Sequence, residues 1–169
     1  MRRVLSRGAA IRQPSANGRY ADGMSAVLVL NGPNLGRLGS REPDVYGSGT
    51  LQDLRALLER SAPAEVTIDL RQTNDEAELI GWLYEAVDSR SPVILNPAAF
   101  THYSYALRDA AALVTTAGLT LIEVHISNPH AREEFRHTSV ISAVATGVIA
   151  GFGFGSYVLA LDHILRTAS

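Results

Sequence analysis

The stretch AVLVL at residues 26–30, followed by the loop NGPNLGRLGSREPDVYG at residues 31–47, begins a regular alternation of strands and helices. Five apolar residues in a row are typical of a strand that is buried on both faces, as strands are in a parallel sheet. A loop of this length in a small domain is more often functional than a plain connection. We therefore expect function to be concentrated where this strand ends.

The rest of the chain continues the alternation. Further apolar runs predict strands at 66–70, 93–96, 119–125 and 144–150. Apolar residues at helical spacing predict a helix that begins after Thr50, with Asp53 as its capping-box partner, and further helices at 75–89, 103–116 and 156–166. Five strands separated by helices predict a single-domain α/β fold, a doubly wound, flavodoxin-like parallel sheet with strand order 2-1-3-4-5. In such sheets ligands bind beyond the carboxyl ends of the strands.

The composition excludes several kinds of chemistry. The chain of 169 residues has 15 basic residues, all of them arginine, and no cysteine. Without lysine or cysteine it has no side-chain Schiff base, no P-loop lysine and no catalytic thiol, although a codon bias toward arginine and alanine would give the same counts. A net charge of −2 argues against nucleic acid as a partner. No apolar run approaches the roughly 20 residues that span a bilayer, so we expect a cytoplasmic protein without a membrane segment.

Residues 1–24 differ from the rest of the chain. They carry five arginines and one acid, and they show neither helical nor strand periodicity. We expect a disordered N-terminal extension there and a folded domain over residues 25–169; a transit peptide would have a similar composition.

The loop after the first strand contains Asn34, Arg41 and Tyr46. Tyrosine is a poor base at its ordinary pKa near 10. A neighbouring guanidinium would favour the tyrosinate and lower that pKa, so Arg41 and Tyr46 together could remove a weakly acidic carbon-bound proton. A solvated connection is the alternative.

The loops after the third and fourth strands carry further candidates. Asn96 and His102 follow the third strand and could bind hydroxyl groups, although a histidine before a helix is often a cap or a packed ring. Glu123 and His125 are two apart on the fourth strand and should face the same side. The carboxylate would fix the imidazole tautomer and make His125 a plausible general acid.

The segment after His125 can bind an anion. Ile126 and Ser127 could hold a carboxylate, and Arg132 and Arg136, four residues apart, could bind an anionic or hydroxylated substrate. The alternative for both arginines is an ion pair with a neighbouring glutamate. The sequence GFGFGS at 151–156 does not fit a nucleotide fingerprint, and the histidines have no metal-site spacing, so we expect neither a cofactor nor a metal.

Several of these segments resemble the type II 3-dehydroquinase family. The resemblance rests on NGPNLGRLGSREPDVYG (31–47), TNDEAELIGWLYEA (73–86), ILNPAAFTHYSYALRDA (94–110), IEVHISNPHAREEFRHTSVIS (122–142) and ATGVIAGFG (145–153). It implies a flavodoxin-like fold and a lyase that dehydrates 3-dehydroquinate to 3-dehydroshikimate. The implied reaction is an anti elimination through an enolate, without cofactor or metal, and it serves either aromatic biosynthesis or quinate breakdown.

The resemblance also implies roles for the catalytic residues. Tyr46 would be the base that removes a proton beside the ketone, and Arg41 would hold it as tyrosinate. Asn34 would steady the enolate oxygen through a bound water. His125, oriented by Glu123, would protonate the departing hydroxyl.

Further roles concern binding and assembly. Substrate hydroxyls would be bound by Asn96, His102 and Arg136. Ile126 and Ser127 would receive the carboxylate, and Arg132 would belong to a mobile lid with Arg41. Asp109 would reach into a neighbouring subunit, because the family assembles as dodecamers built from four trimers.

One segment departs from the family pattern. Ala98 and Ala99 stand where the family usually has glycine, and Phe100 stands where tyrosine or leucine is common. An added Cβ is expected to shift this loop or tighten the pocket.

Two alternatives to the enzyme are a flavodoxin-like FMN-binding module and an inactive paralogue. The absence of a Ser/Thr/Gly phosphate cradle argues against the first, and intact Arg41, Tyr46 and His125 argue against the second.

Overall fold

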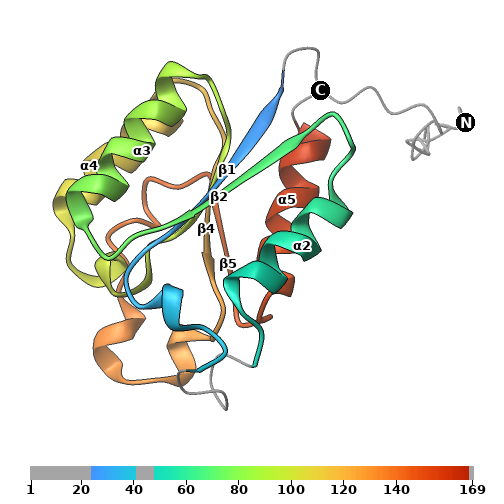
Figure 1. Cartoon of the computed structure of the whole chain (residues 1–169). Helices are drawn as coiled ribbons and strands as arrows, with labels where there is room; N and C mark the ends of the chain where they lie inside the picture. The colour runs from blue at the N-terminus through green and yellow to red at the C-terminus, as the bar shows by residue number, and fades with distance from the viewer. Residues whose placement is uncertain (1–23, 41–47, 168–169) are drawn as a thin grey trace, which may run out of the picture.

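The computed structural model describes residues 24–40 and 48–167 (Figure 1). Its strands are β1 (Ala26–Asn31), β2 (Thr67–Gln72), β3 (Val93–Asn96), β4 (Leu121–His125) and β5 (Gly147–Ala150). They form one five-stranded sheet in the order β2-β1-β3-β4-β5, and every pairing is parallel. The predicted flavodoxin-like strand order is therefore confirmed.

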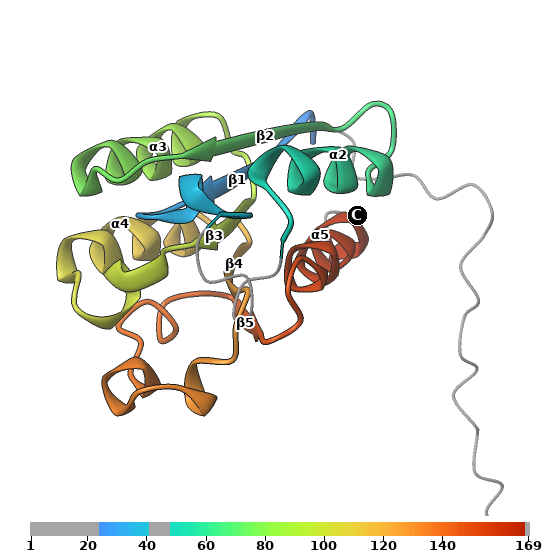
Figure 2. The ribbon, with the colours of Figure 1, turned by 60° about the horizontal axis from the view of Figure 1, so that its bottom comes forward.

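Among the described residues, four α-helices cover the two faces of the sheet: α2 (Leu51–Ser61), α3 (Glu76–Asp88), α4 (Tyr105–Thr116) and α5 (Gly155–Thr167). Helices α3 and α4 lie on one face, and α2 and α5 lie on the other (Figures 1 and 2). Because side chains alternate along a strand, β1 supplies both layers: Val27 and Val29 pack toward α2 and α5, whereas Leu28 and Leu30 pack toward α3 and α4. Each such fully buried side chain contributes about 1.5–3 kcal/mol to folding.

Polar side chains fix where the helices begin. Thr50 and Asp53 form the predicted capping box, in which the Thr50 hydroxyl accepts from Asp53 N at 3.2 Å and Asp53 accepts from Thr50 N at 2.9 Å. Ser104 caps α4 by accepting from Leu107 N at 2.9 Å. The sequence predicted that α4 begins at residue 103. The cap at Ser104 explains why it begins at Tyr105 instead.

Two predicted strands are shorter than expected at their amino ends. Strand β4 begins at Leu121 and β5 at Gly147, instead of residues 119 and 144. Val144 is held in a turn by its N–H, which donates to Ile141 O at 2.9 Å. Sequence pattern alone extended both strands because the residues before them are also apolar.

The described parts of the loops at the carboxyl ends of the strands contain four short 3₁₀ helices that the sequence did not indicate. They are η1 (Leu35–Arg37), η2 (Ala98–His102), η3 (Pro129–Ala131) and η4 (Glu134–His137). These helices gather at one end of the sheet, at the foot of Figure 1. This end is where the predicted site residues fall.

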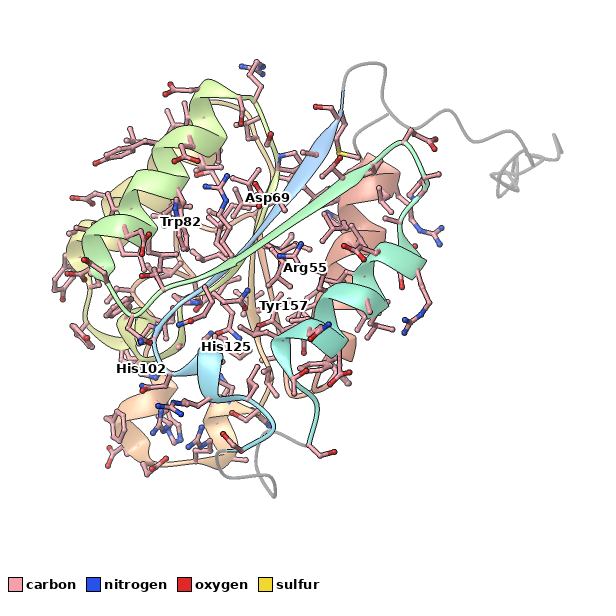
Figure 3. The ribbon with its side chains drawn as sticks, in the orientation of Figure 1. Arg55, Asp69, Trp82, His102, His125 and Tyr157 are labelled. Atoms are coloured by element: carbon pink, nitrogen blue, oxygen red, sulfur yellow. The ribbon has the colours of Figure 1, made fainter. Side chains whose placement is uncertain are left out.

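The outer edge of β2 is partly covered by a side chain from α2. Arg55 lies against this edge (Figure 3) and donates to Leu70 O at 2.6 Å and to Ile68 O at 3.5 Å.

Among the described residues, no helix has both the length and the apolar character needed to cross a membrane.

Candidate active site

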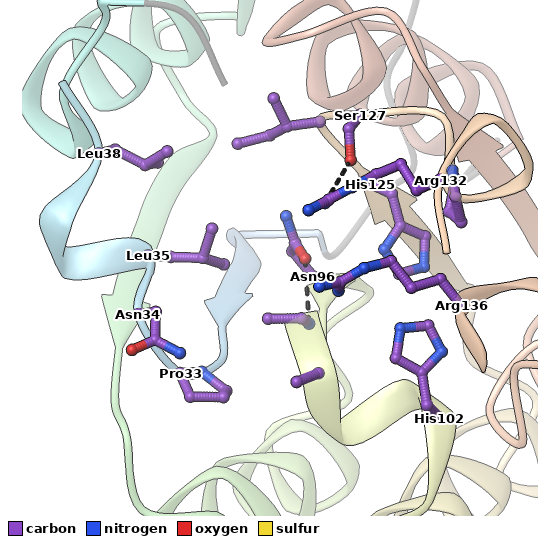
Figure 4. A pocket seen from close by; sticks show the side chains of 14 residues that line it. Pro33, Asn34, Leu35, Leu38, Asn96, His102, His125, Ser127, Arg132 and Arg136 are labelled. Atoms are coloured by element: carbon purple, nitrogen blue, oxygen red, sulfur yellow. Dashed lines mark hydrogen bonds between the residues drawn. The ribbon is translucent and has the colours of Figure 1, made fainter. Parts of the chain in front are cut away.

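A pocket opens at the carboxyl ends of β1, β3 and β4 (Figure 4). It is lined by Pro33, Asn34, Leu35, Leu38, Asn96, Ala98, Ala99, His102, His125, Ile126, Ser127, Pro129, Arg132 and Arg136. Eight of the predicted site residues are therefore brought together from three loops. Arg41 and Tyr46 lie outside the described residues, so their predicted roles remain predictions.

The Glu123–His125 pair lies at the base of this pocket. Glu123 is fully buried, and its Oε1 is 2.8 Å from His125 Nε2, as the spacing on a strand predicts. The hydroxyls of Thr101, Ser139 and Ser142 also contact its carboxylate.

Burial alone would raise the pKa of the Glu123 carboxyl, because water no longer solvates its charge. The hydrogen bond and charge of His125, together with the hydroxyls of Ser142 and Thr101, outweigh burial and hold the pKa below its ordinary 4.5. Glu123 is therefore an anion at neutral pH, behind an imidazole that faces the pocket.

Asn96 is held from behind by a chain of buried polar groups. Its Nδ2 donates to Tyr157 Oη at 2.7 Å, and Tyr157 Oη donates to Asn31 Oδ1 at 2.7 Å. Asn96 Oδ1 accepts from Ala98 N at 3.1 Å. Burial raises the pKa of the Tyr157 hydroxyl above its ordinary 10, so it is a neutral donor and not a base. The amide of Asn96 therefore has one orientation, with a single N–H left over for a ligand.

The β1 loop is pinned where it passes the β3 loop. A Cβ on Gly32 would lie 2.6 Å from Pro97 O, so only glycine permits this approach. Asn34 adopts a left-handed backbone conformation with φ 68°, and its N–H donates to Asn74 Oδ1 at 2.8 Å. These contacts carry the side chain of Asn34 to the pocket wall (Figure 4).

Arg132 and Arg136 line the pocket and also form ion pairs with a neighbouring glutamate, so both alternatives predicted from the sequence apply. Arg136 Nε lies 2.7 Å and Arg132 Nε 3.6 Å from Glu133 Oε2, and both arginines line the pocket. Arg132 Nη1 also donates to Ser127 Oγ at 3.3 Å. The two arginines do not share a helix, because η3 ends before Arg132 and Arg136 lies in η4.

His102 is oriented by a carbonyl group. Its Nδ1 lies 2.8 Å from Thr138 O. A carbonyl only accepts, so Nδ1 carries the hydrogen and Nε2 is the acceptor when the ring is neutral. The ring also packs edge-on against Phe135, with centroids 5.7 Å apart.

The loop that departs from the family pattern holds alanine in a glycine conformation. Ala98 has φ 49°, in the left-handed region that L-residues seldom occupy. Its Cβ lies in the pocket wall, as does Ala99. Phe100 instead packs into the core between the sheet and α3/α4.

The GFGFGS segment (151–156) supports the backbone of the site. It forms the turn from β5 to α5, with φ 92° at Gly151 and 59° at Gly153. Gly151 N donates to His125 O at 3.2 Å, and Ser156 Oγ donates to the same oxygen at 2.9 Å. The segment therefore fixes the backbone that carries His125.

Several supporting residues were missed in the sequence. Asn31, Tyr157, Thr101, Ser139 and Ser142 contact the predicted site residues from behind. The only signal was a concentration of hydroxyl residues in HTSVIS, 137–142.

Asp109 lies outside the pocket, on α4, with a side chain that is 78% exposed. Within residues 24–40 and 48–167, no three His, Cys, Asp or Glu side chains are grouped so that they could hold a metal ion.

A doubly wound parallel sheet with a glutamate–histidine pair and two arginines at a pocket on its carboxyl edge defines a flavodoxin-like α/β protein with a polar site at that edge. The family described as dehydroquinase class II matches residues 25–165. The chain belongs to this family, and the resemblance noted in the sequence is confirmed.

Named relatives agree with this assignment. The 3-dehydroquinate dehydratases of Salinispora tropica and Mycobacteroides abscessus are each 56% identical, over 84% and 85% of this chain and 98% of each relative. The crystal structure of type II dehydroquinase from Propionibacterium acnes superposes with a TM-score of 0.80 at 49% identity, covering 84% of this chain and 97% of that one.

Proposed function

We propose that this chain dehydrates 3-dehydroquinate to 3-dehydroshikimate by anti elimination of water through an enolate. The observation that carries the proposal is the Glu123–His125 pair facing a pocket that also presents Asn34 and two arginines, in a chain of the class II dehydroquinase family. The reaction needs no electron acceptor, because the substrate loses only a proton from carbon and a hydroxyl group.

The acid half of the reaction falls to His125. Protonated His125 gives its proton to the departing hydroxyl, which leaves as water, and the electron pair of the enolate forms the new carbon–carbon double bond. Buried Glu123 contacts Nε2 of this ring at 2.8 Å. It also holds the ring so that the opposite edge meets the substrate.

The base half falls to Tyr46 and Arg41 on the first loop. Tyr46, held as tyrosinate by the guanidinium of Arg41, removes the proton beside the ketone. Asn34 steadies the enolate oxygen through a bound water, and its fixed backbone supports this role.

The remaining pocket residues bind the substrate. Asn96, His102 and Arg136 bind its hydroxyls, and each is already held by a protein partner on its far side. Ile126 and Ser127 receive the carboxylate. Arg132 acts in a lid together with Arg41.

Assembly and location are also part of the proposal. The chain forms a cytoplasmic homododecamer, a tetramer of trimers, in which Asp109 reaches the site of a neighbouring subunit. The 78% exposure of the Asp109 side chain on α4 supports this role, although Oδ1 already accepts from Arg108 Nη1 at 3.1 Å and a partner would compete with or join that ion pair.

Ultraviolet absorbance of the conjugated enone in the product tests the activity. Wild-type protein should generate this absorbance from pure 3-dehydroquinate, whereas Tyr46→Phe and His125→Ala should lose nearly all turnover. His163→Gln is the matched control, because His163 is exposed on α5, away from the pocket. No product from the wild type would refute the activity. Undiminished turnover in Tyr46→Phe or His125→Ala would refute the assignment of that residue.

A further inference from the structure

The carboxylate of Glu123 is surrounded by hydrogen-bond donors, and only one of them is His125. The other three are the hydroxyls of Thr101, Ser139 and Ser142, which we call the hydroxyl cluster. Thr101 Oγ1 lies 2.5 Å from Oε1, and Ser142 Oγ lies 2.5 Å from Oε2. Ser139 Oγ lies 3.0 Å from Oε1 and 3.2 Å from Oε2.

We propose that the hydroxyl cluster keeps Glu123 ionised and thereby fixes His125 in the tautomer that carries hydrogen on Nε2, so that the catalytic proton leaves and returns through Nδ1. Thr101, Ser139 and Ser142 are then positioning residues for the acid step. The catalytic part of this inference rests on the proposed dehydratase function, whereas the tautomer does not.

Backbone contacts determine which way the hydroxyl hydrogens point. Ser139 Oγ accepts from Ile141 N at 3.1 Å and from Ser142 N at 2.9 Å. Its two lone pairs are thus occupied, and it cannot also accept from Thr101, whose oxygen is 2.7 Å away. The hydrogen of Thr101 is therefore directed to Glu123 Oε1.

The hydroxyl donors favour an ionised Glu123. An ionised carboxylate has about four lone-pair sites. Three hydroxyls and Nε2 of His125 contact its two oxygens. A proton on Glu123 could be accepted only by Nε2 of a neutral His125, and the hydroxyls would then donate to an uncharged carboxyl group, with which they form weaker hydrogen bonds in this fully buried site.

An ionised Glu123 then determines the state of His125. Nε2 faces the carboxylate at 2.8 Å, so it carries hydrogen in both the neutral and the charged ring. The nitrogen left to exchange the catalytic proton is Nδ1, which makes no hydrogen bond within the described part of the chain. The ring itself lines the pocket (Figure 4).

Other charged and titratable groups surround the pair without replacing this contact. His102, Arg132 and Arg136 line the same pocket, and His130 and His137 line the adjoining groove behind His125. Their described hydrogen bonds go to other partners, and Glu123 accepts only from His125 and the hydroxyl cluster among the residues that the structure describes. Within the described residues, the cluster therefore supplies every hydrogen bond to Glu123 that does not come from His125.

The direction of the effect follows from the dipoles. The hydroxyls of Thr101 and Ser142 point their positive ends at Glu123 and lower the proton affinity of the whole pair, whereas the single hydrogen of Ser139 is shared between Glu123 and Thr101 Oγ1 at 2.7 Å. Removing one hydroxyl makes His125 hold its proton more tightly, so it becomes a weaker acid. The turnover number should fall, and the alkaline limb of its pH profile should move to higher pH.

Substitutions at Thr101 give a matched pair of variants. Thr101→Val keeps the shape of the side chain and removes the hydroxyl, whereas Thr101→Ser keeps the hydroxyl. We expect Thr101→Val to lower kcat about tenfold, with KM changed less than about twofold, because one hydrogen bond to a charged group is lost. Its alkaline limb should shift upward, and Thr101→Ser should resemble the wild type. Ser142→Ala repeats the test at Oε2 if Thr101→Val does not fold.

Nitrogen NMR of ligand-free protein labelled with ¹⁵N-histidine reads the tautomer directly. The signals of His125 are identified by their loss in His125→Gln. At a pH where the ring is neutral, Nε2 should be protonated and Nδ1 not. The opposite tautomer, or equal kinetics in Thr101→Val and Thr101→Ser, would overturn the inference. A wild type without turnover would instead refute the proposed function, and the NMR result would still decide the tautomer.

Discussion

Substitution of Tyr157 by phenylalanine tests the buried chain that holds Asn96. The change removes one hydroxyl that donates to Asn31 Oδ1 and accepts from Asn96 Nδ2, each at 2.7 Å. Tyr157 and Asn31 are fully buried, and Asn96 is 3% exposed. An unsatisfied buried group costs about 1–3 kcal/mol. Asn31 Oδ1 should bear that full cost, whereas Asn96 borders the pocket and can recover part of it from water. We therefore expect the free energy of unfolding to fall by about 2–4 kcal/mol.

Denaturant unfolding followed by circular dichroism measures this loss, with all variants compared at one protein concentration. Tyr84→Phe is the matched control, because the side chain of Tyr84 is 49% exposed on α3. It should stay within about 0.5 kcal/mol of the wild type. Enzyme assays of Tyr157→Phe should also show a raised KM, because the amide of Asn96 is no longer held in one orientation.

A free energy of unfolding for Tyr157→Phe equal to that of Tyr84→Phe would refute this reasoning. It would mean that the Asn31 and Asn96 side chains find other partners at no cost. A large loss of stability with an unchanged KM would refute only the claim that Tyr157 positions Asn96 for the substrate.

Three further changes test the loops and the acid pair. Ala98→Gly should raise stability by up to about 1 kcal/mol, since relief of the left-handed strain exceeds the added freedom of the unfolded chain; a loss in denaturant unfolding would contradict this. Gly32→Ala should cost about 1–3 kcal/mol and weaken substrate binding, because its Cβ would lie 2.6 Å from Pro97 O, whereas Gly81→Ala, with open space around it, should not destabilise. The depressed pKa of Glu123 contributes stability that is present at neutral pH and lost as the pH falls below its ordinary 4.5. Unfolding measured down to about pH 3 should show a smaller acid loss in Glu123→Gln, and an equal loss would contradict the assignment.

The strands, and the placement of Glu123 and His125 on one face of a strand, could be predicted because both depend on local periodicity. The run at 26–30 is apolar at every position, which identifies a central strand buried on both faces. The spacing of Glu123 and His125 predicts a shared face, and they lie in contact. The starts of β4 and β5 were predicted too early, since apolar residues also precede the first paired position of each strand.

The supporting contacts could not be predicted because they join distant parts of the chain. Tyr157 bonds to Asn31 and Asn96, which are 126 and 61 residues away. In the sequence Tyr157 is an ordinary residue of an amphipathic helix. The left-handed backbone of Ala98 also has no local signal, because the surrounding fold imposes a conformation that alanine does not prefer.

The contact of Arg55 with the outer edge of β2 bears on how the protein meets other molecules. An outermost strand exposes carbonyl groups that invite pairing with a strand of another chain, which is how ordered aggregates begin. Arg55 occupies the carbonyls of Ile68 and Leu70 on that border of the sheet and places a positive charge there. A second strand would have to displace this guanidinium before it could pair. Arg55 therefore disfavours pairing of a further strand at this edge.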